Sequence, residues 1–158
     1  MRVIILRGLP GSLKSTWAAQ QENSIVLSTD DYFMVDGEYK FDPTKLSEAH
    51  LWNMKEYYRE IHKPRPLSLK KETTICVANT STQLWEMSYY VSLARVLCLL
   101  PEIIWFKCSV ETSKARNSHG VPDKVIESMN ERFQNKGKDV LGCPQKIIET
   151  DSISMDET

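Results

Sequence analysis

The residues best suited to chemistry lie in one short run, Gly8-Leu9-Pro10-Gly11-Ser12-Leu13-Lys14-Ser15. Its glycine, lysine and hydroxyl spacing is typical of a P-loop, whose backbone N–H groups surround phosphate oxygens. The Lys14 ammonium would bridge the β- and γ-phosphates of a nucleoside triphosphate, and the Ser15 hydroxyl would ligate Mg²⁺. We therefore expect ATP and Mg²⁺ to be cofactors, bound by Gly8, Pro10, Gly11, Ser12, Leu13, Lys14, Ser15 and Thr16.

One position of this loop departs from the motif, because Leu13 stands where a second glycine normally precedes the lysine. Glycine lets the backbone approach phosphates and adopts dihedrals that strain a leucine by about 1–3 kcal/mol. We expect Leu13 to weaken nucleotide binding. The alternative is a plain strand-turn-helix with an unrelated lysine, but the intact residues on both sides of Leu13 favour a P-loop.

Further polar residues follow two other predicted strands. Asp30 comes just after the second strand, where ligands of open α/β sheets bind, and its carboxylate could accept a proton or hold water around Mg²⁺. Capping of a helix by Asp30 or Asp31 is the alternative. Asn79 and Thr80 end the third strand at the same edge and could hydrogen-bond substrate or metal-bound water, or simply form a turn.

These residues need an alternating set of strands and helices to position them. Short β-branched runs predict strands at 2–7, 24–28, 73–77 and 102–107, with a last strand at 146–148. Helical spacing predicts helices at 14–22, 43–62, 85–97, 110–117 and 122–133, and 63–71 is expected to be a loop. The pattern predicts one α/β domain with a mostly parallel sheet over residues 1–149, followed by a loose acidic tail at 150–158.

Composition narrows the classes of partner. The 158 residues carry a net charge of -1, so no global basic field draws in nucleic acid and any such contact must be local. Four cysteines lie far apart without metal-ligand spacing, and three of them occupy apolar runs, which argues against zinc and for buried thiols in a reducing, cytoplasmic protein. No apolar stretch approaches the length of a membrane span, so we expect no membrane contact.

The sequence resembles the polynucleotide-kinase-like branch of P-loop kinases over most of its length. The resemblance is carried by these segments: Leu6–Ser12, Ser28–Phe33, Ala49–Asn53, Asn79–Met87, Ala115–Asn117 and His119–Pro122. It implies a three-layer P-loop NTPase fold whose parallel sheet is flanked by helices, with a short helical lid over the phosphates. It also implies that ATP-Mg²⁺ is the phosphoryl donor and a 5′-hydroxyl DNA or RNA end the acceptor.

The same resemblance assigns roles to individual side chains. Lys14 and Ser15 match its nucleotide-binding pair, Asp30 its general base, and Arg116 its lid arginine, which stabilises charge on the transferred phosphoryl group. Asp31, Asn79 and Thr80 are expected to contact substrate. Besides Leu13, the chain has Ala78 where the family usually has aspartate and Ser81 where it often has asparagine, and both lie on the proposed catalytic edge.

Three functions remain open on this basis. The first is a kinase acting on a terminal hydroxyl of a polynucleotide, and the second is a catalytically impaired pseudokinase that binds nucleotide or a partner protein. A simple NTP hydrolase is the third. Several aromatic residues could stack a base or pack in the core, namely Tyr32, Phe33, Tyr39, Trp52 and Trp85.

Overall fold

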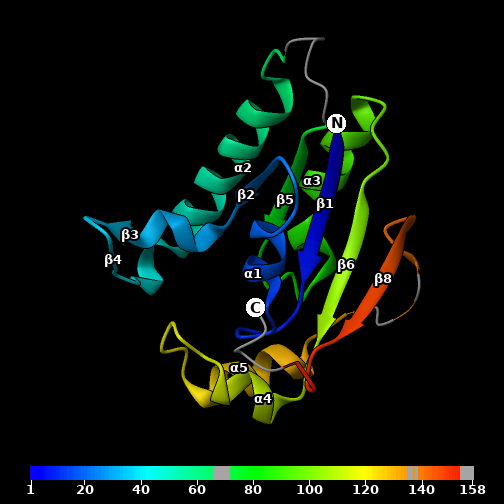
Figure 1. Ribbon diagram of the computed structural model, residues 1–158. Coiled ribbons are helices and arrows are strands. Elements are labelled where there is room, and N and C mark those ends of the chain that lie inside the picture. Colours follow the sequence, from blue (N-terminus) through cyan, green and yellow to red (C-terminus); the bar gives the residue numbers. More distant parts are fainter. Residues whose placement is uncertain (66–71, 135–136, 138, 154–158) are drawn as a thin grey trace.

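In the computed structural model, residues 1–65, 72–134, 137 and 139–153 are described. Their central feature is a six-stranded sheet in the order β2-β5-β1-β6-β8-β7 (Figure 1). The pairs that join β2, β5, β1, β6 and β8 are parallel, and β7 is antiparallel to β8. The strands are β1 (Arg2–Arg7), β2 (Ser24–Leu27), β5 (Thr74–Ala78), β6 (Glu102–Lys107), β7 (Asp139–Val140) and β8 (Cys143–Glu149).

Helices cover both faces of this sheet, as expected for parallel strands. They are α1 (Lys14–Ala19), α2 (Leu46–His62), α3 (Leu84–Val96), α4 (Val110–Ala115) and α5 (Asp123–Glu131), with two 3₁₀ helices, η1 (Thr29–Phe33) and η2 (Pro43–Lys45). The predicted α/β P-loop fold is thereby confirmed. The predicted loop at 63–71 falls largely outside the described residues.

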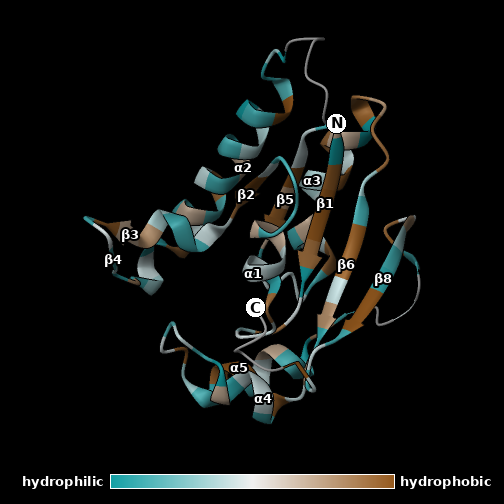
Figure 2. Cartoon of the chain, viewed as in Figure 1, coloured by the Kyte–Doolittle hydropathy of each residue, from teal (hydrophilic) through white to brown (hydrophobic). Residues whose placement is uncertain are grey.

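The alternation of side chains along β1 creates the two halves of the core. Val3 and Ile5 pack with residues of α2 and α3 such as Tyr90, while Ile4 and Leu6 pack on the other face with residues such as Ala18 of α1. The central strands are therefore apolar on both faces, and β1 and β5 are mostly brown in Figure 2. This double burial fixes β1, and with it the loop that follows its carboxyl end.

A small hairpin, absent from our sequence expectations, lies beside the sheet. Strands β3 (Met34–Val35) and β4 (Glu38–Tyr39) pair in antiparallel fashion around Asp36 and Gly37, which both have positive φ values, 53° and 82°. An Asp-Gly pair is a strong hairpin signal, so the sequence did contain the information needed to find it.

The end of the described chain differs from the loose tail that we expected from residue 150. Thr150 is fully buried, and its backbone N–H donates to the Lys107 carbonyl at 2.9 Å. The Asp151 carboxylate accepts a hydrogen bond from the Ser109 N–H at 2.9 Å. Residues 150–153 are thus attached to the carboxyl end of β6, and the rest of the tail lies outside the described residues.

The cysteines follow the sequence expectation only in part. Cys76 is buried as expected, but Cys98 is exposed and Cys108 is half-buried. Cys143 is buried, and all four cysteines are free thiols. Within the described ranges, no group of three or more His, Cys, Asp or Glu side chains is arranged to hold a metal ion. None of the described helices has the length and apolar character needed to cross a membrane.

Candidate nucleotide and acceptor site

The loop between β1 and α1 depends on two glycines for its shape. Gly8 has φ 149°, and a Cβ there would lie 2.3 Å from the Phe106 carbonyl oxygen. Gly11 has φ 68°, and its Cβ would lie 2.8 Å from Cβ of Arg116, just after α4. Any larger residue would therefore push the loop away from β6 or from the α4 end.

Leu13 adopts the glycine-like conformation that the motif requires. It is the N-cap of α1 with φ 69° and ψ 16°, in the left-handed region, and its carbonyl accepts the first helical hydrogen bond from Trp17 at 3.0 Å. A non-glycine residue there is strained by roughly 1–2 kcal/mol. Its side chain is only 8% exposed, so burial of the leucine offsets part of that strain. The loop keeps the P-loop backbone despite the substitution.

Lys14 is buried within the loop. It is 9% exposed, and its Nζ donates to the carbonyls of Gly8 at 2.9 Å and Leu9 at 2.8 Å and to Ser12 Oγ at 3.2 Å. Burial lowers the pKa of Lys14 to about 8, partly opposed by the charges of Cys108 and Asp30. The ammonium thus lies inside the loop, where it would meet a phosphate group.

The hydroxyl residues after Lys14 begin α1. Ser15 is exposed and Thr16 is half-buried, both in the first turn of the helix. A short helix adds only a modest positive potential here, so the fit to a phosphate rests on the enclosed Lys14 and the loop N–H groups. Ser15 has the exposure that a Mg²⁺ ligand needs, and its metal role stays a prediction.

The two aspartates after β2 have different surroundings. The Asp31 carboxylate accepts from the Ser28 N–H at 3.3 Å and caps η1, and burial raises its pKa. The exposed Asp30 carboxylate instead accepts a hydrogen bond from the Tyr39 hydroxyl at 3.3 Å. Asp30 is therefore accessible, and its role as a proton acceptor stays a prediction, while Asp31 has the capping role given above as the alternative.

Asn79 and Thr80 connect this edge of the sheet to its loops. The Asn79 side-chain oxygen accepts from the Thr29 N–H at 2.9 Å, and the Thr80 carbonyl accepts from the Gly8 N–H at 2.9 Å. These bonds hold η1 and the P-loop against the end of β5. They support the structural alternative for both residues, and substrate contact by either stays a prediction.

The two departures from the family pattern near Asn79, Ala78 and Ser81, leave this part of the sheet edge without a charged side chain. Ala78 is buried at the end of β5, where the resemblance leads one to expect a carboxylate. Ser81 is buried with φ 46°, and its hydroxyl has no hydrogen-bond partner among the described residues. Neither side chain supplies the negative charge that would hold Mg²⁺ waters.

Arg116 lies just after α4, at the lid, but its guanidinium is already engaged. Its Nη1 donates to the Thr150 carbonyl at 2.9 Å, and its Nη2 donates to the carbonyls of Asp151 at 3.4 Å and Ile153 at 2.6 Å. The same helix is joined to the P-loop by the Ser113 hydroxyl, which donates to the Pro10 carbonyl at 2.7 Å. Arg116 thus fastens residues 150–153 beside the P-loop, and reaching a nucleotide would require it to exchange these acceptors.

The lid also contacts the hairpin on the acceptor side. The ring of His119, between α4 and α5, lies 4.6 Å from the ring of Tyr39 in β4. In Figure 1 the loop that joins α4 to α5 rises toward this hairpin. The Tyr39 side chain therefore links the lid turn to Asp30.

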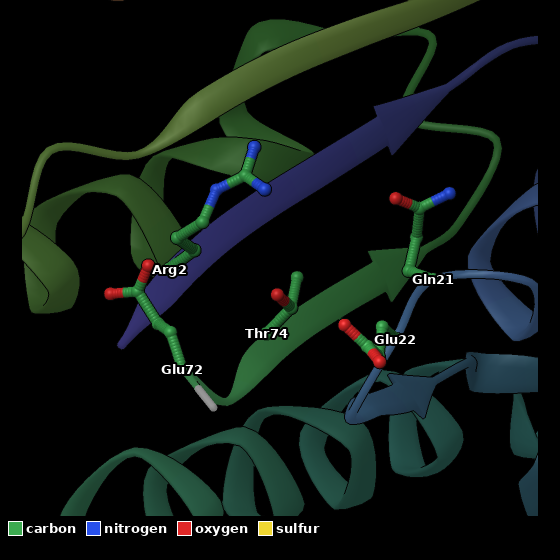
Figure 3. A pocket seen from close by; sticks show the side chains of 5 residues that line it. All are labelled: Arg2, Gln21, Glu22, Glu72 and Thr74. Carbon is green, nitrogen blue, oxygen red and sulfur yellow. The ribbon is translucent and has the colours of Figure 1, made fainter. Parts of the chain in front are cut away.

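Two surface pockets lie at opposite places in the fold. One of about 260 Å³ lies at the amino ends of β1 and β5, away from the P-loop, and Figure 3 shows its polar lining. Its Arg2 pairs with Glu102 and its Glu72 with the N-terminal amine. The other, of about 480 Å³, lies beside η1 and η2 and is lined by Tyr32, Phe33, Val35, Lys40, Phe41, Asp42 and Lys45.

The aromatic residues named from the sequence separate into two places. Tyr32 and Phe33 line the larger pocket, and Trp52 packs on Tyr32 with ring centroids 5.9 Å apart. Trp85 lies on α3 instead and is 59% exposed. Sequence reasoning missed Phe41, Lys40 and Lys45 at the pocket, although Lys40 and Phe41 are the first two residues after the Asp-Gly hairpin.

Comparison with known proteins gives a family match and sequence relatives. A family described as "AAA domain" matches residues 3–135. Human NEDD4-binding protein 2 is 39% identical over 141 residues, which cover 84% of this chain and 8% of that protein. The chain therefore spans only a small part of this relative.

Solved structures with the same fold are more distant in sequence. Kti12 from Chaetomium thermophilum, in complex with ADP-AlF3, superposes with a TM-score of 0.63 at 12% identity, covering 94% of this chain and 89% of Kti12. A chain of the Pnkp1/Rnl/Hen1 RNA repair complex gives 0.59 at 21% identity, covering 84% of this chain and 44% of that one. At these identities the similarity establishes the fold alone.

Proposed function

Because this chain belongs to the AAA-domain family, a P-loop kinase-like family, we propose that it transfers the γ-phosphoryl group of ATP to a terminal hydroxyl of nucleic acid. The observation that carries the proposal is that one edge of the sheet holds an enclosed Lys14 ammonium and an accessible Asp30 carboxylate, whose charges interact. Phosphoryl transfer needs a cation for the phosphates and one proton acceptor for the attacking hydroxyl.

Each residue at this edge has a separate role in the proposed reaction. Asp30 accepts the proton of the acceptor hydroxyl while that oxygen bonds to the γ-phosphorus and the bond to the β-phosphate oxygen breaks. Lys14 offsets the negative charge on the phosphate oxygens, and Ser15 is the candidate ligand for Mg²⁺. ATP with Mg²⁺ supplies the activated phosphoryl group.

Two proteins of similar fold are consistent with this assignment. Kti12 was solved with a nucleotide and an aluminium fluoride. Pnkp1 belongs to an RNA repair complex, which suits an acceptor made of nucleic acid. We extend both features to this chain as part of the proposal, with the cytoplasm as the expected location.

A binding protein without turnover is the second candidate, and the position of Arg116 favours it. The guanidinium that should stabilise the transferred phosphoryl group is occupied by the Thr150, Asp151 and Ile153 carbonyls. Ala78 adds to this case, because it removes a carboxylate near the metal position. In this alternative Lys14 binds nucleotide and no transfer follows.

One assay separates the two candidates. The purified chain is incubated with γ-labelled ATP, Mg²⁺ and 5′-hydroxyl DNA or RNA oligonucleotides, and label on the strand is measured, with 5′-phosphorylated strands as the control. Label on the hydroxyl strands alone supports the kinase. If the parent binds ATP but puts no label on the strand, and the double variant Leu13→Gly and Ala78→Asp does put label on it, the site is an impaired kinase site.

A further inference from the structure

An open aromatic pocket is formed by the stretch of chain that follows the proposed proton acceptor, Asp30. Its volume is about 480 Å³, within the usual range for small-ligand sites. Its walls come from the end of η1, the β3–β4 hairpin and η2, which follow one another along the chain and fold into one concave surface. A cluster of rings, not a loop alone, defines this surface.

Phe41 is the exposed ring of that cluster, and it contacts the buried ring of Phe33 and the half-buried ring of Tyr39. It is 51% exposed, whereas Phe33, whose ring centroid lies 5.0 Å away, is only 3% exposed. The Tyr39 ring is nearly parallel to Phe41, at 6.4 Å and 13°. Phe41 therefore presents a fixed aromatic face to solvent, which is the feature that stacks an unpaired base.

Tyr39 connects this ring cluster to the reacting edge. Its ring contacts Phe33 and Phe41, while its hydroxyl donates to the Asp30 carboxylate at 3.3 Å. A hydroxyl positioned at Asp30 would thus carry its own sugar and base toward the pocket. Only the terminal residue of a strand has a free 5′-hydroxyl, so its base is the one that would lie toward the pocket.

The charges around the pocket limit how much of a strand can bind. Lys40 and Lys45 are its basic residues, and Lys40 is ion-paired with Glu38 at 3.0 Å. The Asp42 carboxylate is held by the backbone N–H of Thr44 at 2.9 Å and adds negative charge. Attraction for a long row of phosphates is therefore small, and stacking must supply most of the affinity.

We propose that this pocket receives the single unpaired terminal base of a nucleic-acid acceptor, stacked on Phe41; the inference rests on the kinase function proposed above. The acceptor is then a single-stranded or frayed end, because a paired terminal base has its face covered by the neighbouring base pair. Phe41 is a specificity-determining residue, and Lys45 contacts the first phosphate after the terminal sugar.

Equilibrium binding tests the pocket without any transfer step. A 5′-hydroxyl oligonucleotide with a fluorophore at its 3′ end is titrated with the chain, and anisotropy is measured without ATP. Phe41→Ala should weaken binding about 5- to 150-fold, the range for loss of one base–aromatic stack, whereas Phe41→Tyr should retain it. Trp85→Ala removes an equally exposed ring on α3 and serves as the matched control, and circular dichroism verifies that each variant is folded.

Two further probes distinguish terminal-base stacking from general strand binding. An oligonucleotide whose 5′-terminal residue is abasic should bind the parent as weakly as the normal strand binds Phe41→Ala. The affinity should also change little with strand length, and the plot of log affinity against log salt concentration should have a slope of about -0.7 to -1.4, for one or two phosphate contacts.

The outcomes separate this inference from the function on which it rests. If binding depends on the terminal base but no label is transferred, the result supports the proposed pocket and rejects the proposed kinase function. Transfer with equal affinity for normal and abasic ends, or an unchanged affinity in Phe41→Ala, would reject the pocket alone. The pocket proposal is also rejected if no strand binds, or if the affinity depends steeply on strand length and salt concentration.

Discussion

The Lys14 ammonium donates a hydrogen bond to the Leu9 carbonyl at 2.8 Å, inside the loop that we expect to receive phosphate. The loop thus supplies carbonyl oxygens to a cation that is almost completely buried. Phosphate oxygens would compete for the same three donor hydrogens. The nucleotide affinity of the chain should therefore depend strongly on this one side chain.

Replacement of Lys14 by alanine should nearly abolish ATP binding without unfolding the chain. The change removes the only charge that the loop encloses among the residues described, and it also removes a buried cation whose desolvation is unfavourable. Calorimetric titration and circular dichroism measure the two effects. An alanine variant that binds ATP like the parent would show that the nucleotide site has been misplaced.

The depressed pKa of Lys14 gives a pH dependence of stability. The pKa is about 8 in the fold, against 10.5 for the ordinary side chain. Above 10.5 the lysine is neutral in both states, and below 8 the folded chain holds an unfavourable charge, so stability should rise between these pH values by on the order of 3 kcal/mol. The difference in urea unfolding free energy between the parent and Lys14→Met isolates this effect, and a pH-independent difference contradicts it.

Leu13→Gly should change stability and affinity in opposite directions. Loss of a buried leucine and the extra backbone entropy of glycine remove about 2–4 kcal/mol, and relief of the left-handed strain returns about 1–2, so the fold should lose about 1–2 kcal/mol. ATP binding should tighten by about 1–3 kcal/mol, because the loop backbone can move closer to the phosphates. Leu13→Asn is the control, since asparagine tolerates this conformation but keeps a Cβ. Unchanged ATP affinity in both variants would remove Leu13 as the cause of weak binding.

Asp30→Asn should reduce phosphoryl transfer by about 10²- to 10⁴-fold, the usual contribution of acid–base catalysis. ATP affinity should change much less, because this side chain acts on the acceptor hydroxyl. Single-turnover transfer and equilibrium binding measure the two effects, and Asp36→Asn in the hairpin turn is the control. Equal transfer by the Asp30 variant and the parent would assign Asp30 to another role.

Arg116→Ala should release residues 151–153 from the lid, because it removes the donor to three carbonyls. Amide exchange in that segment should accelerate, and Arg116→Lys should restore it only in part since an ammonium lacks the planar fork. If the arginine also stabilises the transferred phosphoryl group, transfer falls by about 10³-fold in the alanine variant. Faster exchange with unaltered transfer would limit Arg116 to its structural role.

The central strands of the sheet could be predicted from the sequence because they are buried on both faces and therefore appear as short apolar runs. The bounds predicted for β1 and β6 agree with the structure, since each is a short apolar run that ends at a loop. Helix α1 is shorter than predicted, ending at Ala19, and Asn23 takes a left-handed conformation just before β2. Ends of elements depend on such local turns more than on periodicity.

The side-chain environments of the site were less predictable, because they depend on contacts distant in sequence. The Asp30 partner Tyr39 is set by the hairpin, and the Arg116 partners come from residues more than thirty positions further along the chain. Burial of Lys14 follows from three acceptors that the loop turns inward. Motif spacing singled out Lys14, the position after a strand singled out Asp30 and the family resemblance singled out Arg116, but none of these showed what the side chain contacts.

The contact between His119 and Tyr39 also provides an internal spectroscopic reporter. The two ring centroids lie 4.6 Å apart, so the ring current of the tyrosine shifts the proton resonances of this imidazole. The chain has three histidines, and the other two lie against different neighbours, His50 at Thr29 and His62 at Tyr58. The imidazole signals of one residue can therefore report, without any attached label, whether the lid turn and the hairpin are together or apart.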